Sequence, residues 1–169
     1  CMDPDALKAA AGRGARAVYL MPNLHNPTMA TMPLPRRRAI AAVAEAADLL
    51  ILEDDVYGFL VEAPLPLFAA LAPARTALIG SVSKFMSPAL RVGWIAPPLV
   101  RTAEVIGALR GLSWMTSPLL AEVAATALAS GEGDRIARLQ RDEATTRMAL
   151  VRQHLAPWLK DLPPTAMHV

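Results

Sequence analysis

Cysteine is almost absent from this chain of 169 residues. Cys1 is its only cysteine, so no disulfide can form within the chain, and a reducing compartment such as the cytoplasm is expected. Long apolar runs are missing too, because each run is either of strand length or interrupted by charge, which argues against a transmembrane helix. The first residues also lack a basic stretch followed by an apolar one, and this argues against a signal peptide.

A strong net charge is a third absence. The formal charge is +2, and the densest basic run is Arg36-Arg37-Arg38. Because this triplet opens a predicted helix, we interpret it as a solvated helix face and not as a patch for nucleic acid. The three histidines are scattered and no metal-ligand spacing is present, so no metal site is predicted.

What the chain does contain is enough apolar residues, many of them alanine, for one domain with a substantial core. Runs of strand length lie at 16–21, 49–52, 77–81 and 92–96. Helical patterns cover 34–47, 99–111 and 133–156, and Ser117-Pro118 starts a further helix that Gly131 ends. The first two strands and the helix between them form a βαβ unit, which predicts an α/β fold with a parallel sheet.

Polar side chains follow three of these strands directly. Asn26-Pro27-Thr28 comes after the first, Asp54-Asp55-Val56-Tyr57 after the second, and Ser81-Val82-Ser83-Lys84 after the third. Ligands of open parallel sheets bind outside the carboxyl ends of the strands, so these side chains are expected at one edge. Three such groups in order carry more weight than any one of them.

The third group suits an aldehyde cofactor that carries a phosphate. Lys84 supplies an amine that can form an imine with the aldehyde and can also move the α-proton of an amino-acid substrate. Ser81 and Ser83 offer hydroxyls to the phosphate, and Arg91 offers a planar fork of donors.

The first two groups suit the ring of such a cofactor, pyridoxal phosphate. Asp54 can keep the ring nitrogen protonated, which makes the ring an electron sink. Tyr57 and Asn26 can donate hydrogen bonds to the ring oxygen.

Most of these residues also have a plainer structural explanation. Asp54 or Asp55 alone can cap the next turn, Tyr57 can be a half-buried core aromatic, and Asn26-Pro27 can be an ordinary turn. A lysine after Ser-x-Ser is commonly a solvated loop residue. Three further residues are given structural roles only: His25 in a loop, and Trp94 and Trp114 in the core.

The motifs together resemble a known family. Asn-Pro-Thr at 26–28, Asp-x-x-Tyr at 54–57 and Ser-x-Ser-Lys-x6-Arg-x-Gly at 81–93 are similar, in order and spacing, to the large domain of fold-type I, class I/II pyridoxal-phosphate aminotransferases. The stretch 83–94 looks most like the aminotransferase-like domain of MocR-type regulators of the GntR family, and like 2-aminoadipate aminotransferases. The resemblance runs from about residue 16 to residue 169.

The resemblance implies a three-layer α/β fold, in which a mostly parallel sheet is flanked by helices. Residues 1–160 would be a partial large domain that binds pyridoxal 5′-phosphate, and residues 161–169 the start of a small domain that is absent. It also implies amino-acid and 2-oxo-acid substrates, a homodimer, and a cis peptide bond at Asn26-Pro27. The roles that it implies agree with those above: Lys84 as the Schiff-base residue, Asp54 at the ring nitrogen, Asn26 and Tyr57 at the ring oxygen, and Ser81, Ser83 and Arg91 at the phosphate.

The chain departs from the family pattern in two respects. A glycine usually follows Asn-Pro-Thr, whereas Met29 stands here, so the backbone of that loop is open to difference. The family's upstream phosphate-binding turn and ring-stacking aromatic, and its downstream arginine for the substrate carboxylate, have no counterpart, so we expect a fragment of a longer protein.

Three functions remain open at this stage. The first is an aminotransferase. The second is a transcriptional regulator in which this domain binds pyridoxal phosphate as an effector, with DNA bound by an N-terminal winged helix-turn-helix outside the chain. The third is a degenerate α/β domain without cofactor, and the presence together of Asp54, Lys84 and Arg91 argues against it.

Overall fold

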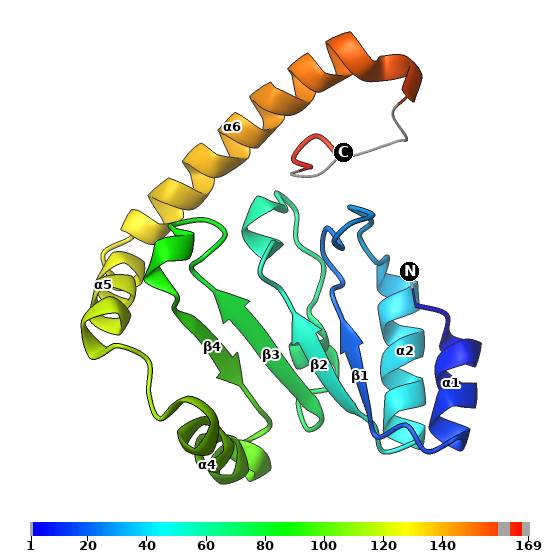
Figure 1. Cartoon of the computed structure of the whole chain (residues 1–169). Coiled ribbons are helices and arrows are strands. Elements are labelled where there is room, and N and C mark those ends of the chain that lie inside the picture. The colour runs from blue at the N-terminus through cyan, green and yellow to red at the C-terminus, as the bar shows by residue number, and fades with distance from the viewer. Residues whose placement is uncertain (1, 159–162, 167–169) are drawn as a thin grey trace.

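The computed structural model describes residues 2–158 and 163–166. The expected helices and strands are present among them. In chain order the elements are α1 (Pro4–Gly12), β1 (Ala17–Leu20), α2 (Leu34–Ala46), β2 (Leu50–Asp54), α3 (Phe68–Leu71), β3 (Thr76–Ser81), β4 (Gly93–Ala96), α4 (Thr102–Ser113), α5 (Pro118–Ala129) and α6 (Glu132–Leu155) (Figure 1). Strand β2 runs to Asp54, further than expected, so this aspartate belongs to the end of the strand itself. The expected domain boundary after residue 160 lies outside the described residues.

The four strands form one sheet in the order β1-β2-β3-β4. Strands β1, β2 and β3 are parallel, and β4 is antiparallel to β3. The register pairs Leu20 with Glu53 and Asp54 with Ile79, so the carboxyl ends of the three parallel strands share one edge, at the top of Figure 1. The prediction of a mostly parallel sheet is confirmed.

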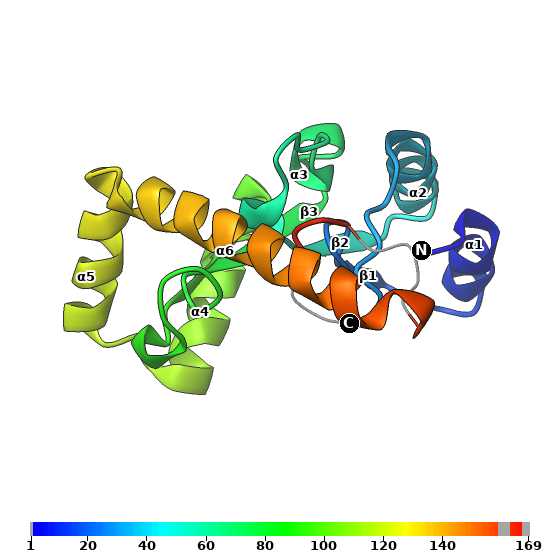
Figure 2. The ribbon, with the colours of Figure 1, turned by 90° about the horizontal axis from the view of Figure 1, so that it is seen from above.

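Helices α1, α2 and α3 build the core on one face of the sheet. Val18 and Leu20 alternate with exposed residues along β1, as expected for a strand with one buried face. They pack in a cluster whose other buried members are Leu7, Met32, Ile40, Ala44, Leu49, Ile51 and Phe68. Figure 2 shows α2 and α3 on one side of the sheet and α4 on the other, which gives the layered arrangement that the resemblance implies.

Two carboxylates fix the starts of helices. Asp3 Oδ1 accepts hydrogen bonds from the amides of Asp5 (2.8 Å) and Ala6 (3.3 Å), which caps α1. Glu53 is fully buried, and its two carboxylate oxygens accept from Phe68 N and Ala69 N, each at 2.8 Å. Burial raises the pKa of the Glu53 carboxyl, against the effect of these two hydrogen bonds. Through this contact the end of β2 holds the start of α3.

The interpretation of the arginine triplet is wrong for Arg37. Its side chain is completely buried, whereas Arg38 is exposed. The first turn of α2 packs against the loop after β1, and backbone carbonyls there accept the guanidinium hydrogen bonds. A buried arginine is tolerated because its donors find fixed acceptors.

The placement of two tryptophans in the core is also wrong. Trp94 is 44% exposed and Trp114 is 74% exposed. Trp94 pairs with Gly80 across β3 and β4, and its indole covers that glycine so closely that a Cβ at Gly80 would overlap the ring. Trp114 directly follows α4, a helix with no buried residue. No helix within the described residues is both long and apolar enough to cross a membrane.

Candidate active site

The polar groups predicted from the sequence gather at the carboxyl ends of β1, β2 and β3. Helix α6 passes above this edge in Figure 1. Its side chains Ala144 and Met148 pack with Leu24, which follows β1, and with Tyr57, which follows β2. Helix α6 therefore covers part of the edge at which the parallel strands end.

Asp54 ends β2 with both carboxylate oxygens engaged. Oδ1 accepts a hydrogen bond from Val56 N at 3.1 Å, so the turn-capping role considered above is real. Oδ2 accepts from the Tyr19 hydroxyl at 2.5 Å. Each carboxylate oxygen has two lone pairs, so Asp54 keeps capacity for a further donor.

Tyr19 is a residue of this edge that the sequence motifs do not reveal. It lies on β1 opposite Leu52, and Asp54 is two residues beyond Leu52 on the same face of the sheet. Partial burial, followed by the hydrogen bond to Asp54 and the charge of that carboxylate, raises the pKa of Tyr19 to about 12. Alternation along the two strands could have suggested this pair, once the register was known.

Lys84 and Tyr57 lie close together. Tyr57 is only 3% exposed, in the cluster beneath α6, so it is a more deeply buried aromatic than the plainer explanation required. Lys84 is exposed, and its Nζ lies 5.7 Å from the centre of the Tyr57 ring. A cation over an aromatic face at this distance is weakly attracted to it. The ring therefore helps to keep the amine at this edge.

Ser81, Ser83 and Arg91 form a second group beside the lysine. Ser81 Oγ donates to Val92 O (3.0 Å) and accepts from Ser83 N (3.0 Å), which tightens the turn after β3. Ser81 pairs with Gly93 on β4, so the antiparallel return of the chain brings Arg91 back to the end of β3. Arg91 is exposed and has φ of 52°, a left-handed conformation that is uncommon for a residue with a Cβ.

Asn26 lies in the loop between β1 and α2. The peptide bond from Asn26 to Pro27 is cis, as the resemblance implied. The loop is closed by hydrogen bonds from Met32 N to Pro22 O (2.7 Å) and from His25 N to Ala30 O (3.0 Å). Within the described residues no hydrogen bond joins the Asn26 side chain to Asp54 or Lys84, although Met29 of the same loop packs in one cluster with Tyr57. His25 is an exposed loop residue, as interpreted, with its ring 3.0 Å from Thr28 Oγ1.

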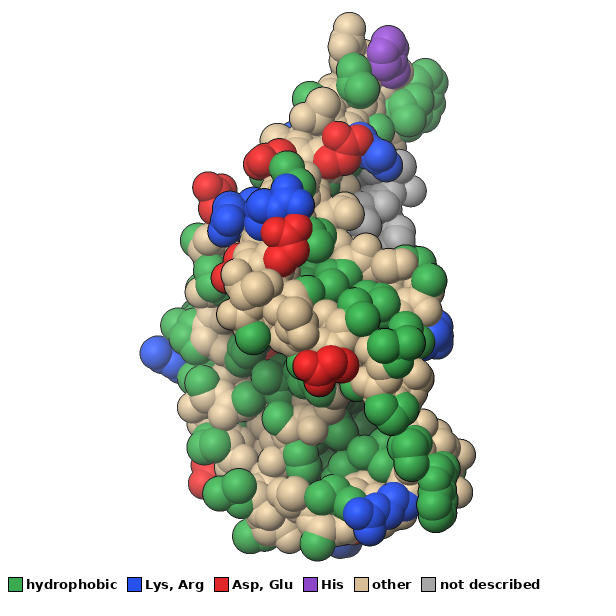
Figure 3. Space-filling model, turned by 90° about the vertical axis from the view of Figure 1, so that its left-hand side faces the viewer, with side chains coloured by type: hydrophobic (Ala, Val, Ile, Leu, Met, Phe, Trp, Pro, Cys, Tyr) green, Lys and Arg blue, Asp and Glu red, His purple; other side chains and the backbone are tan. Residues whose placement is uncertain are grey.

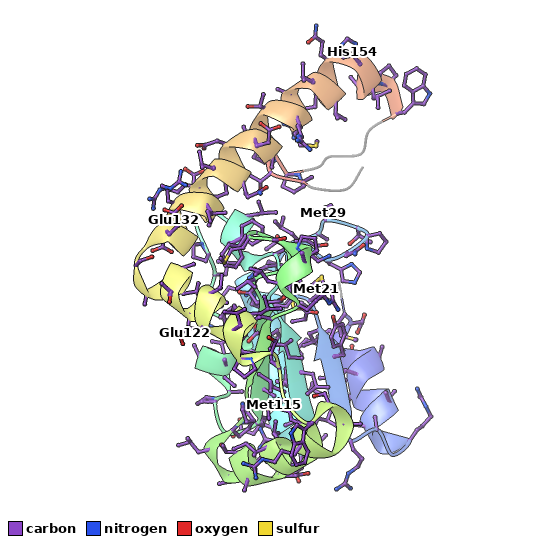
Figure 4. The ribbon with its side chains drawn as sticks, turned by 60° about the vertical axis from the view of Figure 1, so that its left-hand side comes forward. Met21, Met29, Met115, Glu122, Glu132 and His154 are labelled. Carbon is purple, nitrogen blue, oxygen red and sulfur yellow. The ribbon has the colours of Figure 1, made fainter. Side chains whose placement is uncertain are left out.

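Met29 keeps the conformation that a glycine adopts easily. Its φ is 53°, yet its side chain is 1% exposed and packs with Leu24, Tyr57 and Met148. Figure 4 shows Met29 below the upper part of α6. The methionine therefore links the Asn26 loop to α6 through the core.

A buried polar chain supports the two loops from below. Arg37 donates to Asn23 Oδ1 at 2.6 Å, and Asn23 Nδ2 donates to Asp55 Oδ1 at 2.6 Å. Burial raises the pKa of the Asp55 carboxyl, while the hydrogen bond from Asn23 and the charge of Arg37 act in the opposite direction. The chain fixes the loop after β1, which carries Asn26, against the end of β2, which carries Asp54.

Four polar side chains at this edge have no hydrogen-bond or ion-pair partner in the part of the chain that the structure describes. They are the Asn26 amide, the Ser83 hydroxyl, the Lys84 ammonium and the Arg91 guanidinium, none of which makes a hydrogen bond or ion pair there. The hydroxyl and the guanidinium can donate hydrogen bonds to an anion, and the amine can attack a carbonyl as a nucleophile. The Asp54 carboxylate at the same edge can accept a hydrogen bond from a ring N–H.

Comparison with known proteins gives consistent results. The family model described as "Aminotransferase class I and II" matches residues 2–167. The HTH-type transcriptional regulator YdeF of Bacillus subtilis is 33% identical over 92% of this chain and 34% of its own length. The HTH-type pyridoxine biosynthesis transcriptional regulator PdxR of Corynebacterium glutamicum is 34% identical over 89% of this chain and 33% of its own length.

Solved structures show the same fold. LysN, the α-aminoadipate aminotransferase of Thermus thermophilus, solved in complex with N-(5′-phosphopyridoxyl)-L-leucine, superposes with a TM-score of 0.79 at 28% identity. The match covers 90% of this chain and 42% of LysN. The chain spans about a third of the length of YdeF and PdxR.

Proposed function

The chain belongs to the class I and II aminotransferase family, and on this premise we propose that it forms the pyridoxal-phosphate site of an enzyme that exchanges amino groups between an amino acid and a 2-oxo acid. Pyridoxal phosphate is the cofactor that the family and the ligand of LysN indicate. The reaction and the substrates concern the longer protein, since the relatives are about three times as long as this chain.

The residues at the edge fit this cofactor. Asp54 would accept the hydrogen bond of the ring nitrogen, and Lys84 would hold the aldehyde carbon. Arg91 and Ser83 would bind the phosphate with donors that have no other partner within the described residues. The Ser81 hydroxyl donates its hydrogen bond to Val92 O, so it would have to rotate to donate to a phosphate. Asn26 and Tyr57 would lie at the ring oxygen.

When bound, the cofactor supplies a carbonyl for the amino group and a protonated ring that accepts electrons from the substrate α-carbon. The chain's own residues do the rest. The Lys84 amine takes the proton from the α-carbon and returns one, as general base and acid. Tyr57, fixed by the core beneath α6, keeps this amine near the reacting atoms. The Asp54 carboxylate holds the proton at the ring nitrogen.

The observation that carries the proposal is the set of unpartnered donors, within the described residues, beside Asp54 at the carboxyl ends of the parallel strands. The test is amino-group transfer by the full-length protein with pyridoxal phosphate, a panel of amino acids and a 2-oxo acid. We expect a new amino acid to form with at least one donor, and we expect Lys84→Ala to abolish this. Lys8→Ala, on α1 away from the edge, is the matched control and retains activity. If the wild-type protein transfers an amino group from none of the amino acids tested, the proposed enzyme activity is contradicted.

A second function, an effector domain of a DNA-binding regulator, is favoured by one observation. YdeF and PdxR, which match about nine-tenths of this chain, are named as HTH-type regulators. In that case the same residues bind the cofactor, but the bound cofactor changes the affinity of the protein for DNA. The test is to measure DNA affinity with and without pyridoxal phosphate, in the wild-type protein and in Lys84→Ala. A response to the cofactor that is lost in Lys84→Ala, in a protein that transfers no amino group, indicates the regulator.

A further inference from the structure

Tyr19 lies at the proposed cofactor site, but the proposed function assigns it no role. Its ring lies on the face of β1 away from the core, and the residue is 55% exposed. A tyrosine in that position gains little from burial, yet its hydroxyl is bound to one specific acceptor, Asp54 Oδ2, at 2.5 Å. The distance is at the short end for an O–H···O⁻ bond, in which the acceptor is charged.

The bond is set by the sheet and not by a mobile loop. Tyr19 pairs with Leu52 in the β1–β2 ladder, and Asp54 follows two residues later on the same face. The ladder continues on the other side of β2, where Asp54 pairs with Ile79. The other oxygen, Oδ1, is held by Val56 N at 3.1 Å. Asp54 is thus fixed from both sides, with Tyr19 as its only side-chain donor within the described residues.

We propose that Tyr19 is a positioning residue for Asp54, whose hydroxyl orients the carboxylate and withdraws charge from it, and so limits how strongly the ring nitrogen of the cofactor holds its proton. This inference rests on the proposed function, because Asp54 meets the ring nitrogen only if the site binds pyridoxal phosphate. A hydroxyl that donates to one oxygen draws negative charge towards itself, and because the charge is shared between both oxygens, less of it is left for a second donor. Without it, Asp54 is the stronger acceptor and the ring nitrogen keeps its proton to higher pH.

The charged and titratable groups around this pair are few. Tyr19 lines a pocket of about 250 Å³ together with His25 from the loop after β1, and that pocket's other lining residues carry no charge. Asp55 lies next to Asp54 in the chain and turns its carboxylate to Asn23 and the buried Arg37 chain. The hydroxyl of Tyr19 donates to Asp54, so a change at Tyr19 is expected to act first on that carboxylate.

The first test needs no cofactor. The chain has two tyrosines, Tyr19 and Tyr57, so phenolate formation can be followed by near-ultraviolet absorbance with Tyr57 as the remaining signal in Tyr19→Phe. We expect Tyr19 in the wild-type protein to ionise near pH 12, and in Asp54→Asn to ionise closer to the ordinary value of 10. Asp48→Asn, which removes an exposed carboxylate elsewhere, leaves the titration unchanged. An equal titration in Asp54→Asn and wild type overturns the inference.

The second test follows the cofactor itself. Full-length protein is loaded with pyridoxal phosphate that is isotope-labelled at the ring nitrogen, and the nitrogen resonance is recorded against pH. In Tyr19→Phe we expect the ring nitrogen to lose its proton about one pH unit higher, a roughly tenfold gain in proton affinity. Thr146→Val, which removes an exposed hydroxyl from α6, is the control and causes no shift.

The outcomes separate the two proposals. An unchanged or lowered midpoint in Tyr19→Phe, while the cofactor is still bound at Lys84, overturns the role of Tyr19 and leaves the proposed function intact. Failure of the wild-type protein to bind the cofactor at Lys84 overturns both. A raised midpoint supports both, because a purely structural role of Tyr19 would change stability without moving the proton at the ring nitrogen.

Discussion

Tyr19 holds its proton more tightly in the folded protein than in the unfolded chain. Its pKa is raised from the ordinary 10 to about 12, so below pH 10 both states carry the proton and the contribution to stability is complete. Between pH 10 and pH 12 the unfolded chain loses the proton first, and the free energy of unfolding falls. We expect Tyr19→Phe to lose less stability over this interval than the wild type, as measured by denaturant unfolding at several pH values. Parallel curves for the two proteins would contradict the hydrogen bond to Asp54.

Met29 combines a strained backbone with a buried side chain. Truncation of a buried methionine to alanine costs about 2–5 kcal/mol, and we expect Met29→Ala to fall in this range. At φ of 53° a glycine is relieved of the strain that any Cβ causes. We therefore expect Met29→Gly to be more stable than Met29→Ala by about 1 kcal/mol, the reverse of the order in a helix.

The comparison of these two variants by denaturant unfolding is the direct measurement. The matched control is Met148, a buried methionine of the same cluster that lies inside α6, where alanine should be the more stable replacement. If glycine is the less stable replacement at both positions, the left-handed conformation of Met29 is wrong.

At the scale of residues, the sequence located the groups with obvious chemistry but not those that act through others. Lys84, Asp54 and Arg91 are recognisable because each follows or ends a strand and carries charge. Tyr19 is hidden in an apolar strand run, and its role depends on a register that no local pattern specifies. The resemblance indicated that Met29 stands where the family usually has a glycine, but not that the backbone there is left-handed.

At the scale of elements, the start of α2 is tied to the site through Arg37. Its Nε donates to Met32 O, Nη1 to Pro66 O, and Nη2 to Pro22 O and Asn23 Oδ1. Removal of the guanidinium takes the arginine donor away from two buried acceptors, Met32 O and Asn23 Oδ1, so we expect Arg37→Leu to destabilise the fold by about 3–5 kcal/mol.

The neighbouring Arg38 is the natural control, because it has the same chemistry but is exposed. We expect Arg38→Leu to change the free energy of unfolding by less than about 0.5 kcal/mol. Equal effects in the two variants, measured by the same denaturant titration, would show that the polar chain from Arg37 to Asp55 does not stabilise the fold.

Helical periodicity could not have revealed the hydrogen-bonded chain from Arg37 to Asp55. Three consecutive arginines after Pro35 have the pattern of a charged helix face, and which of them points inward depends on how α2 docks on the loop after β1. The strands and helices themselves followed from apolar runs and from Pro and Gly signals, because those features act locally. The docking of one element on another is a property of the whole fold.

At the scale of the whole molecule, one side of the chain exposes many apolar side chains. Figure 3 shows hydrophobic side chains spread over the side that carries α4 and α5. Leu112, Trp114, Met115 and Leu119 are each at least 60% exposed there. Exposed apolar groups gathered in this way indicate a surface that is covered in the assembled protein. We expect the described domain to self-associate, in line with the homodimer that the resemblance implies.

The measurement is molar mass by light scattering over a range of protein concentrations. We expect Leu112→Lys combined with Leu119→Lys to shift the protein towards the monomer, because each places a charge in an apolar contact. Leu155→Lys, near the end of α6, is the control that changes an exposed leucine elsewhere. A wild-type protein that is monomeric at all concentrations would contradict this expectation.

The central claim is that Lys84 holds pyridoxal phosphate, and trapping of the cofactor tests it most directly. Full-length protein is incubated with pyridoxal phosphate and reduced with borohydride, and the modified peptide is located by mass spectrometry. Lys8, Lys84 and Lys160 are the three lysines of this chain, so the assignment within it is unambiguous. We predict one adduct, on Lys84, that is lost in Lys84→Ala and kept in Lys8→Ala. An adduct elsewhere, or none on Lys84 in the folded protein, would contradict the account.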